Sequence, residues 1–260
     1  MSLPVFHSPQ AAEAVAGSAL TLGEDVAGHA VRVRRIGPGE EIDVVDGHGV
    51  RARGTVSTAS ATALVLDVTE VTRTPAHGPR LVLVQALAKG DRDLQAIEAA
   101  TEIGVDEIIP WAAERSIADW PAKKAAKMAA KWENLLTAAS LQSRRSRFPV
   151  LGELARGTGL AHRLGEGTGD SAAADPGGDA IFVLHEAAAT RLTAQLRDLD
   201  AGSTERIVLI VGPEGGITEA ELEALQGIGA RTVVLGDTVL RSSSAGPAGL
   251  VLAQNSLGRW

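Results

Sequence analysis

Strand-like and helix-like segments alternate along the chain from Arg80 onward. Short runs rich in Val, Ile and Leu are followed by longer runs in which apolar residues recur at helical spacing. The strand-like runs are RLVLVQAL, DEIIPW, AIFVLHE, RIVLIVG and RTVVLG, and the helix-like runs are DRDLQAIEAATEIG, AKKAAKMAAKWENLLTAASLQS, AATRLTAQLRDL and TEAELEALQGIG. Because helices supply the long crossovers that parallel strands need, this alternation predicts a parallel sheet flanked by helices. The Gly-rich, polar segment 156–179 predicts a mobile surface loop.

The N-terminal part of the chain has a different pattern, with short alternating runs and many turn-forming residues. Apolar and polar residues alternate with period two through 41–45, 50–56 and 63–68, and the segments DGHG and STAS separate these runs. This pattern predicts a small antiparallel barrel. A chain of 260 residues is long enough for two domains, and we place them at 1–74 and 75–260.

Composition excludes several kinds of site. The 25 Lys and Arg residues against 32 Asp and Glu residues give a net charge of −7, which argues against a protein that coats nucleic acid but permits a local basic patch. The absence of cysteine excludes disulfides, thiolate metal sites and cysteine nucleophiles. No signal-peptide pattern opens the chain and no apolar run is long enough to span a bilayer, so we expect a cytoplasmic protein without a membrane partner.

Common nucleotide-binding and metal-binding motifs are also missing. The segment AKGDRD has its lysine before the glycine and lacks the hydroxyl residue of a P-loop, and no strand-like run is followed by G-x-G-x-x-G. The six histidines do not fall at metal-ligand spacing with a carboxylate on one helix face. We therefore expect no P-loop, no Rossmann dinucleotide site and no metal.

Two glycine-containing segments follow the last two strand-like runs. The segment VGPEGG ends one run, and LGDTVLRSSSAG continues the next. In an open α/β sheet, ligands bind outside the carboxyl ends of the strands. Gly212, Gly215 and Gly216 would let the main chain approach a ligand, and Glu214 and Arg241 supply the charges of note. Together the two segments predict a ligand site.

An alternative is that both segments are only tight turns ahead of helices. Thr218 and Glu221 have the spacing of a capping box, which predicts that a helix starts at TEAELEAL. We accept the capping role for Thr218 and favour a ligand-binding role for the double glycine.

Several motifs together resemble one known family. The segments ALAKGDR, ATEIGVDEIIP, LQSRRSRFP, GPEGG and LGDTVLR occur in the order and spacing of the 16S ribosomal RNA uridine N3-methyltransferase family, the RsmE-like branch of the SPOUT superfamily. The match covers most of the chain, and GHAVRVRRIGPGEEIDVVDGHG is similar to the PUA-like barrel of that family. The resemblance implies a PUA-like RNA-binding β-barrel at 1–74 and a SPOUT α/β domain at 75–260, with a trefoil knot formed by roughly residues 205–260.

The resemblance also implies a reaction, the S-adenosylmethionine-dependent methylation of uridine N3 in 16S ribosomal RNA. Three loops would hold the cofactor largely through backbone groups. The implied cofactor-binding residues are Leu184, His185, Gly212, Pro213, Glu214, Gly215, Gly216, Leu235, Gly236, Val239, Leu240 and Ser242.

Arg241 and Glu214 are the catalytic candidates. The methyl group of the cofactor is already electrophilic, so the protein must position uracil N3 and stabilise the negative charge that builds on the ring as the N3 proton leaves. Arg241 suits that second task, and the alternative is that it pairs with Glu214 or Asp237. The segment RSSSA places Ser243 where family members often have a carboxylate, which leaves Glu214, Asp237 or water to take the proton.

Basic residues predict where RNA would bind. Phosphate contacts need Lys and Arg, whereas the scarcity of aromatic residues disfavours extensive base stacking. Arg51 and Arg53 add basic charge to the barrel, and AKKAAKMAAKW is interpreted as a solvated helix face. For Lys89 and Arg92 the alternative is a strand-to-helix turn that Asp91 caps. The predicted RNA-binding residues are Arg32, Arg34, Arg35, Lys89, Arg92, Arg144, Arg145 and Arg147.

The expected partners are 16S ribosomal RNA or the small ribosomal subunit, and a second copy of the chain. The resemblance places each active site beside a subunit boundary, and GPAGLVLAQNSLGRW offers a small-residue helix for close packing, with Leu250, Leu252 and Leu257 buried partly by the partner. Two alternative functions stay open. One is a noncatalytic RNA-binding ribosome assembly factor that keeps the fold, and the other is methylation of a different RNA.

Overall fold

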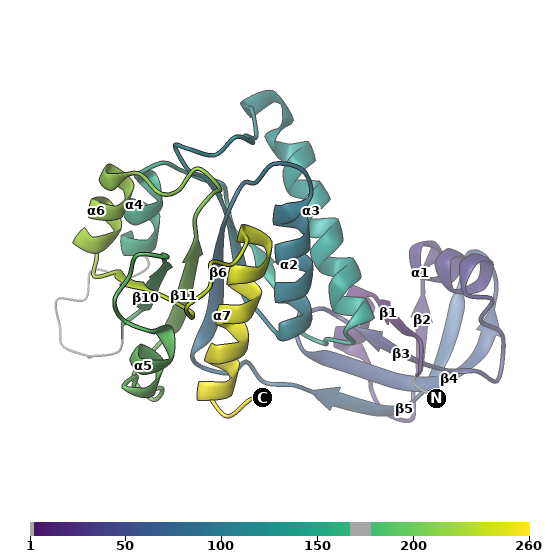
Figure 1. Ribbon diagram of the computed structural model, residues 1–260. Coiled ribbons are helices and arrows are strands. Elements are labelled where there is room, and N and C mark those ends of the chain that lie inside the picture. Colours follow the sequence, from purple (N-terminus) through teal and green to yellow (C-terminus); the bar gives the residue numbers. More distant parts are fainter. Residues whose placement is uncertain (1–2, 167–177) are drawn as a thin grey trace. The chain divides into compact units, whose positions relative to one another are not determined.

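The computed structural model describes residues 3–166 and 178–260. The chain forms two compact units (Figure 1). Unit 1 comprises Met1–Ala76 and Thr137–Phe148, and unit 2 comprises His77–Leu136 and Pro149–Trp260. The segment Thr137–Phe148, which the sequence analysis assigned to the second domain, therefore packs with the N-terminal unit instead.

Unit 1 is built on a five-stranded sheet with the order β1-β3-β4-β5-β2. All its strand pairs are antiparallel except β1 with β3, which is parallel. The pairing path ends at β1 and β2, so the sheet is curled and is not closed into a hydrogen-bonded barrel within the described residues. The strands are β1 (Val5–His7), β2 (Ala19–Leu22), β3 (Glu41–Val45), β4 (Val50–Ala59) and β5 (Leu64–Arg73). The helices are the 3₁₀ helix η1 (Pro9–Glu13), the α-helix α1 (Glu24–Gly28) and the π-helix η2 (His29–Val33).

The period-two alternation of the sequence explains the core of unit 1. In β5 the inward residues Leu64 and Leu66 are fully buried, while their neighbours Val65 and Asp67 are more exposed. Two backbone hydrogen bonds hold the segment Thr137–Phe148 in unit 1. Gly49 N donates to the Ser146 oxygen at 2.9 Å, and Phe148 N donates to the Gly47 oxygen at 2.8 Å. These bonds fix the segment to the turn between β3 and β4.

Unit 2 contains the predicted parallel sheet. Its main path has the order β12-β10-β11-β6-β7-β8, with β9 also paired to β7, and every pair is parallel. The strands are β6 (Arg80–Ala86), β7 (Glu107–Ala112), β8 (Val150–Leu151), β9 (Ala155–Arg156), β10 (Ala180–Leu184), β11 (Arg206–Val211) and β12 (Arg231–Val233). The parallel sheet predicted from the alternation of strand-like and helix-like segments is confirmed.

Helices cover both faces of this sheet. One face packs against α2 (Arg92–Ile103), α3 (Ala122–Gln142), α5 (Leu192–Arg197) and α7 (Ser242–Ser256), and the other against α4 (Gly159–Glu166) and α6 (Glu219–Gly227). Alternate residues of the central strands supply the two cores, since Leu81 and Leu83 belong to the first and Val82 and Val84 to the second. Strands buried on both faces explain the nearly continuous apolar runs.

The small residues of α7 let this helix lie close to its own sheet. A Cβ atom on Gly246 would stand 2.8 Å from Leu83 Cδ1, and one on Gly249 would stand 2.9 Å from Leu209 Cδ1. Both distances are shorter than a carbon–carbon contact allows, so the glycines are needed within the chain itself.

One detail of the dimer hypothesis is therefore wrong. Leu250 is fully buried by its own chain, without any help from a partner, because it lies in the core between α7 and the sheet. Leu252 and Leu257 are half-buried.

The segment 156–179 is only in part the loop that its composition predicts. Its first residues include the end of β9 and the helix α4, whose Leu160 and Leu164 enter the second core. Residues 167–177 lie outside the described residues. Among the described residues, no helix is both long and apolar enough to cross a membrane.

Candidate functional site

A pocket of about 670 Å³ lies at the carboxyl ends of β10, β11 and β12. Three loops line it, namely 184–186, 211–217 and 234–242. These strands meet there because β10 lies between β12 and β11 in the sheet and all three are parallel. Ligands of open α/β sheets bind at this edge, so the position agrees with the expectation from the sequence.

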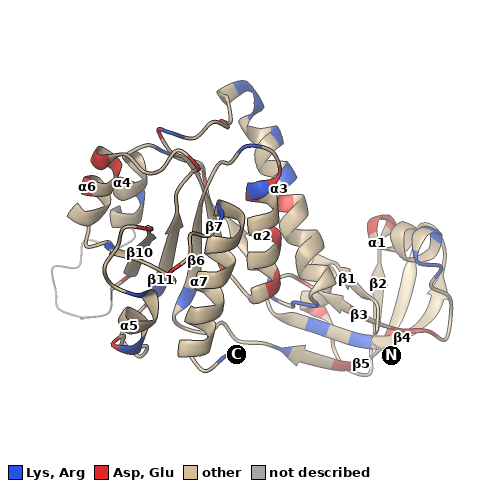
Figure 2. Cartoon of the chain, in the orientation of Figure 1, with Lys and Arg blue, Asp and Glu red and all other residues tan. Residues whose placement is uncertain are grey.

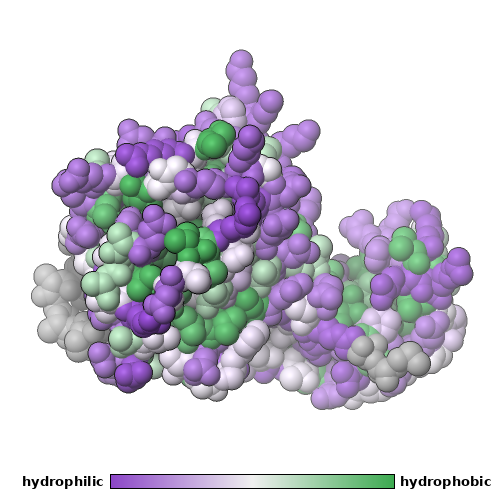
Figure 3. Space-filling view, in the orientation of Figure 1, coloured by the Kyte–Doolittle hydropathy of each residue, from purple (hydrophilic) through white to green (hydrophobic). Residues whose placement is uncertain are grey.

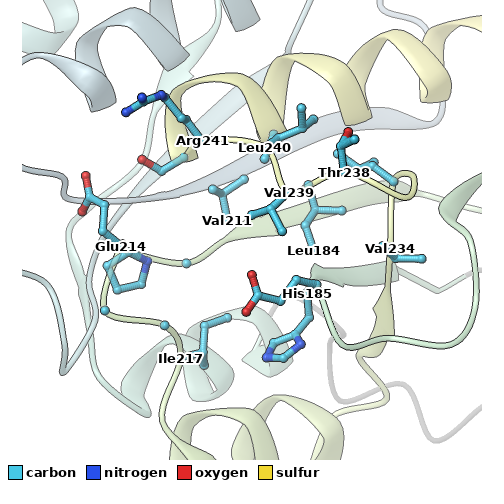
Figure 4. Close-up of a pocket in the computed structure, with 18 of the residues that line it drawn as sticks. Leu184, His185, Val211, Glu214, Ile217, Val234, Thr238, Val239, Leu240 and Arg241 are labelled. Atoms are coloured by element: carbon cyan, nitrogen blue, oxygen red, sulfur yellow. The ribbon is translucent and has the colours of Figure 1, made fainter.

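Every residue predicted to bind the cofactor lines this pocket. The same is true of the two catalytic candidates, Glu214 and Arg241. Figure 4 shows both of these side chains at one end of the pocket, whereas Val234 and Thr238 lie at the other. The structure therefore brings the two glycine-containing segments together.

The glycines of the GPEGG loop meet requirements that come from the protein itself. A Cβ atom on Gly212 would lie 2.6 Å from Ile217 Cγ1, and one on Gly215 would lie 2.9 Å from the Arg115 carbonyl oxygen. Gly216 has a φ of +79°, a left-handed conformation that side chains rarely adopt. The folding of the loop alone therefore accounts for these glycines.

Gly236 and Ser242 point to a ligand more directly. No atom lies within 4 Å of a Cβ built on Gly236, and its φ lies outside the left-handed region, so no neighbour requires glycine at this place on the pocket wall. Ser242 Oγ is buried and has no hydrogen-bond partner within the described residues. A buried hydroxyl without a partner is costly unless a bound molecule or water completes its hydrogen bonds.

Glu214 is held by an ion pair. Arg92 Nη1, from the first turn of α2, donates to Glu214 Oε1 at 2.7 Å. Burial opposes ionisation of this carboxyl, but the hydrogen bond and charge of Arg92 outweigh it, so the net effect is a lowered pKa for Glu214. Glu214 is therefore ionised near neutral pH and is a weak base.

The side chain of Arg241 is available to a ligand. It is exposed and makes no ion pair or hydrogen bond with residues that the structure describes. The carboxylates considered as its partners bind other arginines, since Glu214 pairs with Arg92 and Asp237 pairs with Arg191 at 2.6 Å. The alternative in which Arg241 is only an ion-pair partner is therefore wrong.

The sequence analysis missed Arg115, and it missed a second contact of Glu221. Arg115, which follows β7, lines the pocket and donates weakly to the Gly215 oxygen, at 3.4 Å. Glu221 completes the predicted capping box with Thr218, and its Oε1 also accepts the backbone N–H of Glu114 at 2.8 Å. The sequence signal for Arg115 is its place just after a strand whose carboxyl end shares the edge of the site.

The basic residues predicted to bind RNA fall into two groups. Lys89 and Arg92 belong to unit 2, where Lys89 is exposed and Arg92 pairs with Glu214 in the pocket. Asp91 occupies the N-cap position of α2, as the alternative expected, but its side chain makes no capping hydrogen bond. The others belong to unit 1 and are Arg32, Arg34, Arg35, Arg144, Arg145 and Arg147.

Within unit 1, some arginines have structural contacts. Arg147 Nε donates to the Thr74 oxygen at 2.9 Å. Arg51 and Arg53 both bind the buried carboxylate of Asp43, and although burial opposes ionisation, the two guanidinium groups lower the pKa of Asp43 overall. Arg51 Nη2 also donates to the Arg144 oxygen at 2.6 Å. The charges of Arg51 and Arg53 are therefore partly neutralised.

Arg32, Arg34, Arg35 and Arg144 are exposed. Arg35 and Arg144 have φ values of 58° and 60°, which are uncommon for residues other than glycine. No group of three or more His, Asp or Glu residues suited to a metal ion occurs within 3–166 and 178–260.

The fold and the pocket define a class of protein. The RNA methyltransferase domain model matches residues 76–254, and the RNA methyltransferase PUA domain model matches residues 22–69. The first match alone covers more than half of the chain, so this is an RNA methyltransferase with a PUA domain.

Relatives narrow the class further. The chain is 37% identical to Ribosomal RNA small subunit methyltransferase E of Mycobacterium bovis, over 94% of this chain and 89% of that protein. It is 28% identical to the protein of the same name from Bacillus subtilis, over 86% and 84% of the two chains. The chain belongs to the ribosomal RNA small subunit methyltransferase E family, which confirms the resemblance found in its motifs.

A solved structure shows the same fold. The Ribosomal RNA small subunit methyltransferase E of Neisseria gonorrhoeae, described as bound to S-adenosyl methionine, matches with a TM-score of 0.80 and 24% identity, over 98% of both chains.

Proposed function

We propose that this protein uses S-adenosylmethionine to methylate uridine N3 in 16S ribosomal RNA. The observation that carries this proposal is that every residue predicted to bind the cofactor lines one pocket in a chain of this methyltransferase family. The relative from Neisseria gonorrhoeae, which has the same fold, supports the choice of cofactor.

The chemistry of the pocket fits this cofactor. Backbone groups of 212–216 and the open wall at Gly236 suit a planar adenine edge, and Leu240 adds an apolar contact. The unpartnered Ser242 Oγ offers a hydrogen bond. Glu186, which lines the pocket without an ion-pair partner among the described residues, suits a cationic ligand.

In the proposed reaction, S-adenosylmethionine supplies an electrophilic methyl group. Arg241 donates to a uracil carbonyl oxygen and stabilises the charge that develops as the N3 proton leaves. Glu214, whose carboxylate pairs with Arg92, accepts a hydrogen bond from the N3–H group, receives the proton as the N–H bond breaks, and passes it on to water. Ser243 lies in the first turn of α7 and is too weak a base to take the proton unaided.

We assign part of the RNA binding to unit 1 and methyl transfer to unit 2. The match of the PUA domain model to residues 22–69 supports this division, and so do the exposed side chains of Arg32, Arg34, Arg35 and Arg144. Such groups bind phosphate without reading sequence, so unit 1 would contribute affinity more than specificity.

We also propose that the last part of unit 2, roughly residues 205–260, forms a trefoil knot. After β12 at the edge of the sheet, the chain returns across β10 so that α7 packs on β11 and β6. A chain that returns beneath its own pocket loops would be threaded through them, which is rare in proteins.

A homodimer in the cytoplasm completes the proposal. The outer face of α7 carries the half-buried residues Val251 and Leu252, and Figure 3 shows a hydrophobic area over this helix. Contiguous apolar surface of this kind is typical of an interface. Light scattering that finds a monomer at micromolar concentration would contradict the dimer.

The test of the function is nucleoside mass spectrometry of 16S ribosomal RNA from cells with and without this protein. We expect 3-methyluridine to disappear from one site and to return when the purified protein and S-adenosylmethionine are added. If calorimetry with chelator present detects no cofactor binding although RNA still binds, the protein is a noncatalytic assembly factor. If 16S ribosomal RNA is unchanged in cells without the protein while another RNA loses a methyl group, the proposed substrate is wrong.

A further inference from the structure

The loop that follows β7 reaches the pocket and is not one of the three proposed cofactor loops. Arg115 in this loop lines the pocket and is exposed. The weak bond to the Gly215 oxygen, at 3.4 Å, is the one side-chain hydrogen bond that it makes with described residues. A guanidinium group has five N–H donors, so Arg115 retains most of its capacity for a ligand.

Both ends of this loop are fixed. At the start, Glu114 N donates to the buried carboxylate of Glu221 at 2.8 Å. At the end, Arg156 binds the Asp119 carboxylate at 2.8 Å and the Trp120 oxygen at 2.7 Å. The loop therefore presents Arg115 from a rigid frame, which reduces the entropy that a ligand contact would cost.

Positive charge continues from Arg115 into α3. Lys123, Lys124 and Lys127 are exposed on the first turns of that helix, and Figure 2 shows the basic residues gathered there. From 115 to 127 the single acidic residue is Asp119, which is paired with Arg156. In a chain with a net charge of −7, this run of uncompensated basic charge stands out.

We infer that Arg115 and the three lysines of α3 form a basic rim that binds the RNA phosphates flanking the target nucleotide. Arg115 holds the phosphate nearest to the pocket, since its planar fork matches two phosphate oxygens. The inference rests on the proposed function, because it assumes that the nucleotide enters this pocket. It replaces the interpretation of AKKAAKMAAKW as only a solvated helix face.

The test compares Arg115→Ala with Arg197→Ala. Arg197 is an exposed arginine of the same unit that does not line the pocket, so it controls for the loss of charge. The affinity for 16S ribosomal RNA and for purified small ribosomal subunits is measured across a salt series, alongside calorimetry with S-adenosylmethionine. Arg115→Ala should weaken RNA binding about tenfold, as expected for a lost charge-assisted hydrogen bond.

Salt dependence separates phosphate contacts from other effects. Each lost phosphate contact should reduce the slope of log K against log salt by about 0.7 to 0.9. The variant with Lys123, Lys124 and Lys127 all changed to Ala should therefore lose more slope than Arg115→Ala. Both variants should bind S-adenosylmethionine like the wild type, and Arg197→Ala should match the wild type throughout.

Two results would overturn the inference. One is an unchanged RNA affinity and salt slope in both rim variants, and the other is a loss of cofactor affinity in Arg115→Ala without a loss of RNA affinity. Failure of the proposed function is separate, because it would appear as absent cofactor binding in the wild type.

Discussion

Arg92 Nη1 and Glu214 Oε1 lie 2.7 Å apart and join the first turn of α2 to the loop after β11. This pair connects a helix on one face of the sheet to the loop that carries the double glycine. Both side chains are partly exposed, so the pair adds little to the stability of the fold. The main effect of the pair is on Glu214, because Arg92 favours the ionised form of its carboxyl group.

The first prediction concerns that ionisation. The pKa of Glu214 lies below its ordinary value of 4.5 in the folded protein, so its contribution to stability is present above the unfolded pKa and is lost as pH falls through the folded one. Arg92→Ala leaves burial unopposed by the guanidinium and should raise the pKa. Carboxyl NMR of Glu214 measures the shift.

Two variants serve as controls for this titration. Arg92→Lys keeps a charge and should shift the Glu214 pKa less than Arg92→Ala does. Arg191→Ala breaks the exposed pair with Asp237 and should leave the titration of Glu214 unchanged. An unaltered Glu214 pKa in Arg92→Ala would show that the ion pair does not form in solution.

The second prediction concerns the pocket wall at Gly236. Because a Cβ atom meets no protein atom there, Gly236→Ala should leave the thermal stability of the free protein nearly unchanged. The added methyl group occupies space in the pocket, and overpacking of this kind typically costs about 1–3 kcal/mol. Calorimetry should therefore show weaker S-adenosylmethionine binding.

Gly227→Ala is the matched control for Gly236→Ala. A Cβ atom on Gly227 also meets nothing within 4 Å, but this residue is the last of α6 and does not line the pocket. Equal cofactor affinities in the two variants would mean that the ligand does not approach Gly236.

Much of unit 2 could be predicted from the sequence, because local patterns determine it. Apolar runs separated by helical periodicity identified β6, β10 and β11, and Thr218 with Glu221 identified the start of α6. The pocket followed from the rule that ligands bind at the carboxyl ends of parallel strands. Most of the candidate site was therefore within reach of sequence reasoning.

Contacts between distant segments were not predictable in this way. Nothing in the run LQSRRSRFP indicates that Ser146 and Phe148 bond to the turn at Gly47 and Gly49, far away in the chain. Similarly, the second role of Glu221, as acceptor for Glu114 N, depends on the packing of β7 against β6 and not on local spacing. Such pairings arise from tertiary packing.

The third prediction tests that second role. Glu221 is 1% exposed, and its carboxylate accepts the backbone N–H groups of Thr218 and Glu114. Glu221→Ala leaves both donors without their protein partner. The typical cost is about 1–3 kcal/mol for a buried group, and it is smaller here because Glu114 is exposed and Thr218 is half-buried. Thermal denaturation should show a clear fall in Tm, whereas Glu223→Ala, an exposed change on the same helix, should show almost none.

Glu221→Gln separates the two contacts. Its remaining carbonyl oxygen can accept from one of the two loops but not from both, so its Tm should lie between those of the wild type and Glu221→Ala. A Tm for Glu221→Ala equal to that of Glu223→Ala would contradict the assigned contacts.

The last prediction concerns Arg241, which lines the pocket with an exposed and uncommitted guanidinium group. Since it supports no other residue, Arg241→Ala should leave Tm and the Kd for S-adenosylmethionine nearly unchanged. If its interaction forms mainly in the transition state, the loss appears in the rate, by about 100-fold to 1,000-fold for one charge-stabilising donor. Arg241→Lys should restore little, because an ammonium group lacks the planar fork. Single-turnover methylation at saturating RNA measures the effect, and a cofactor affinity that falls in proportion to the rate would place Arg241 in the binding site instead.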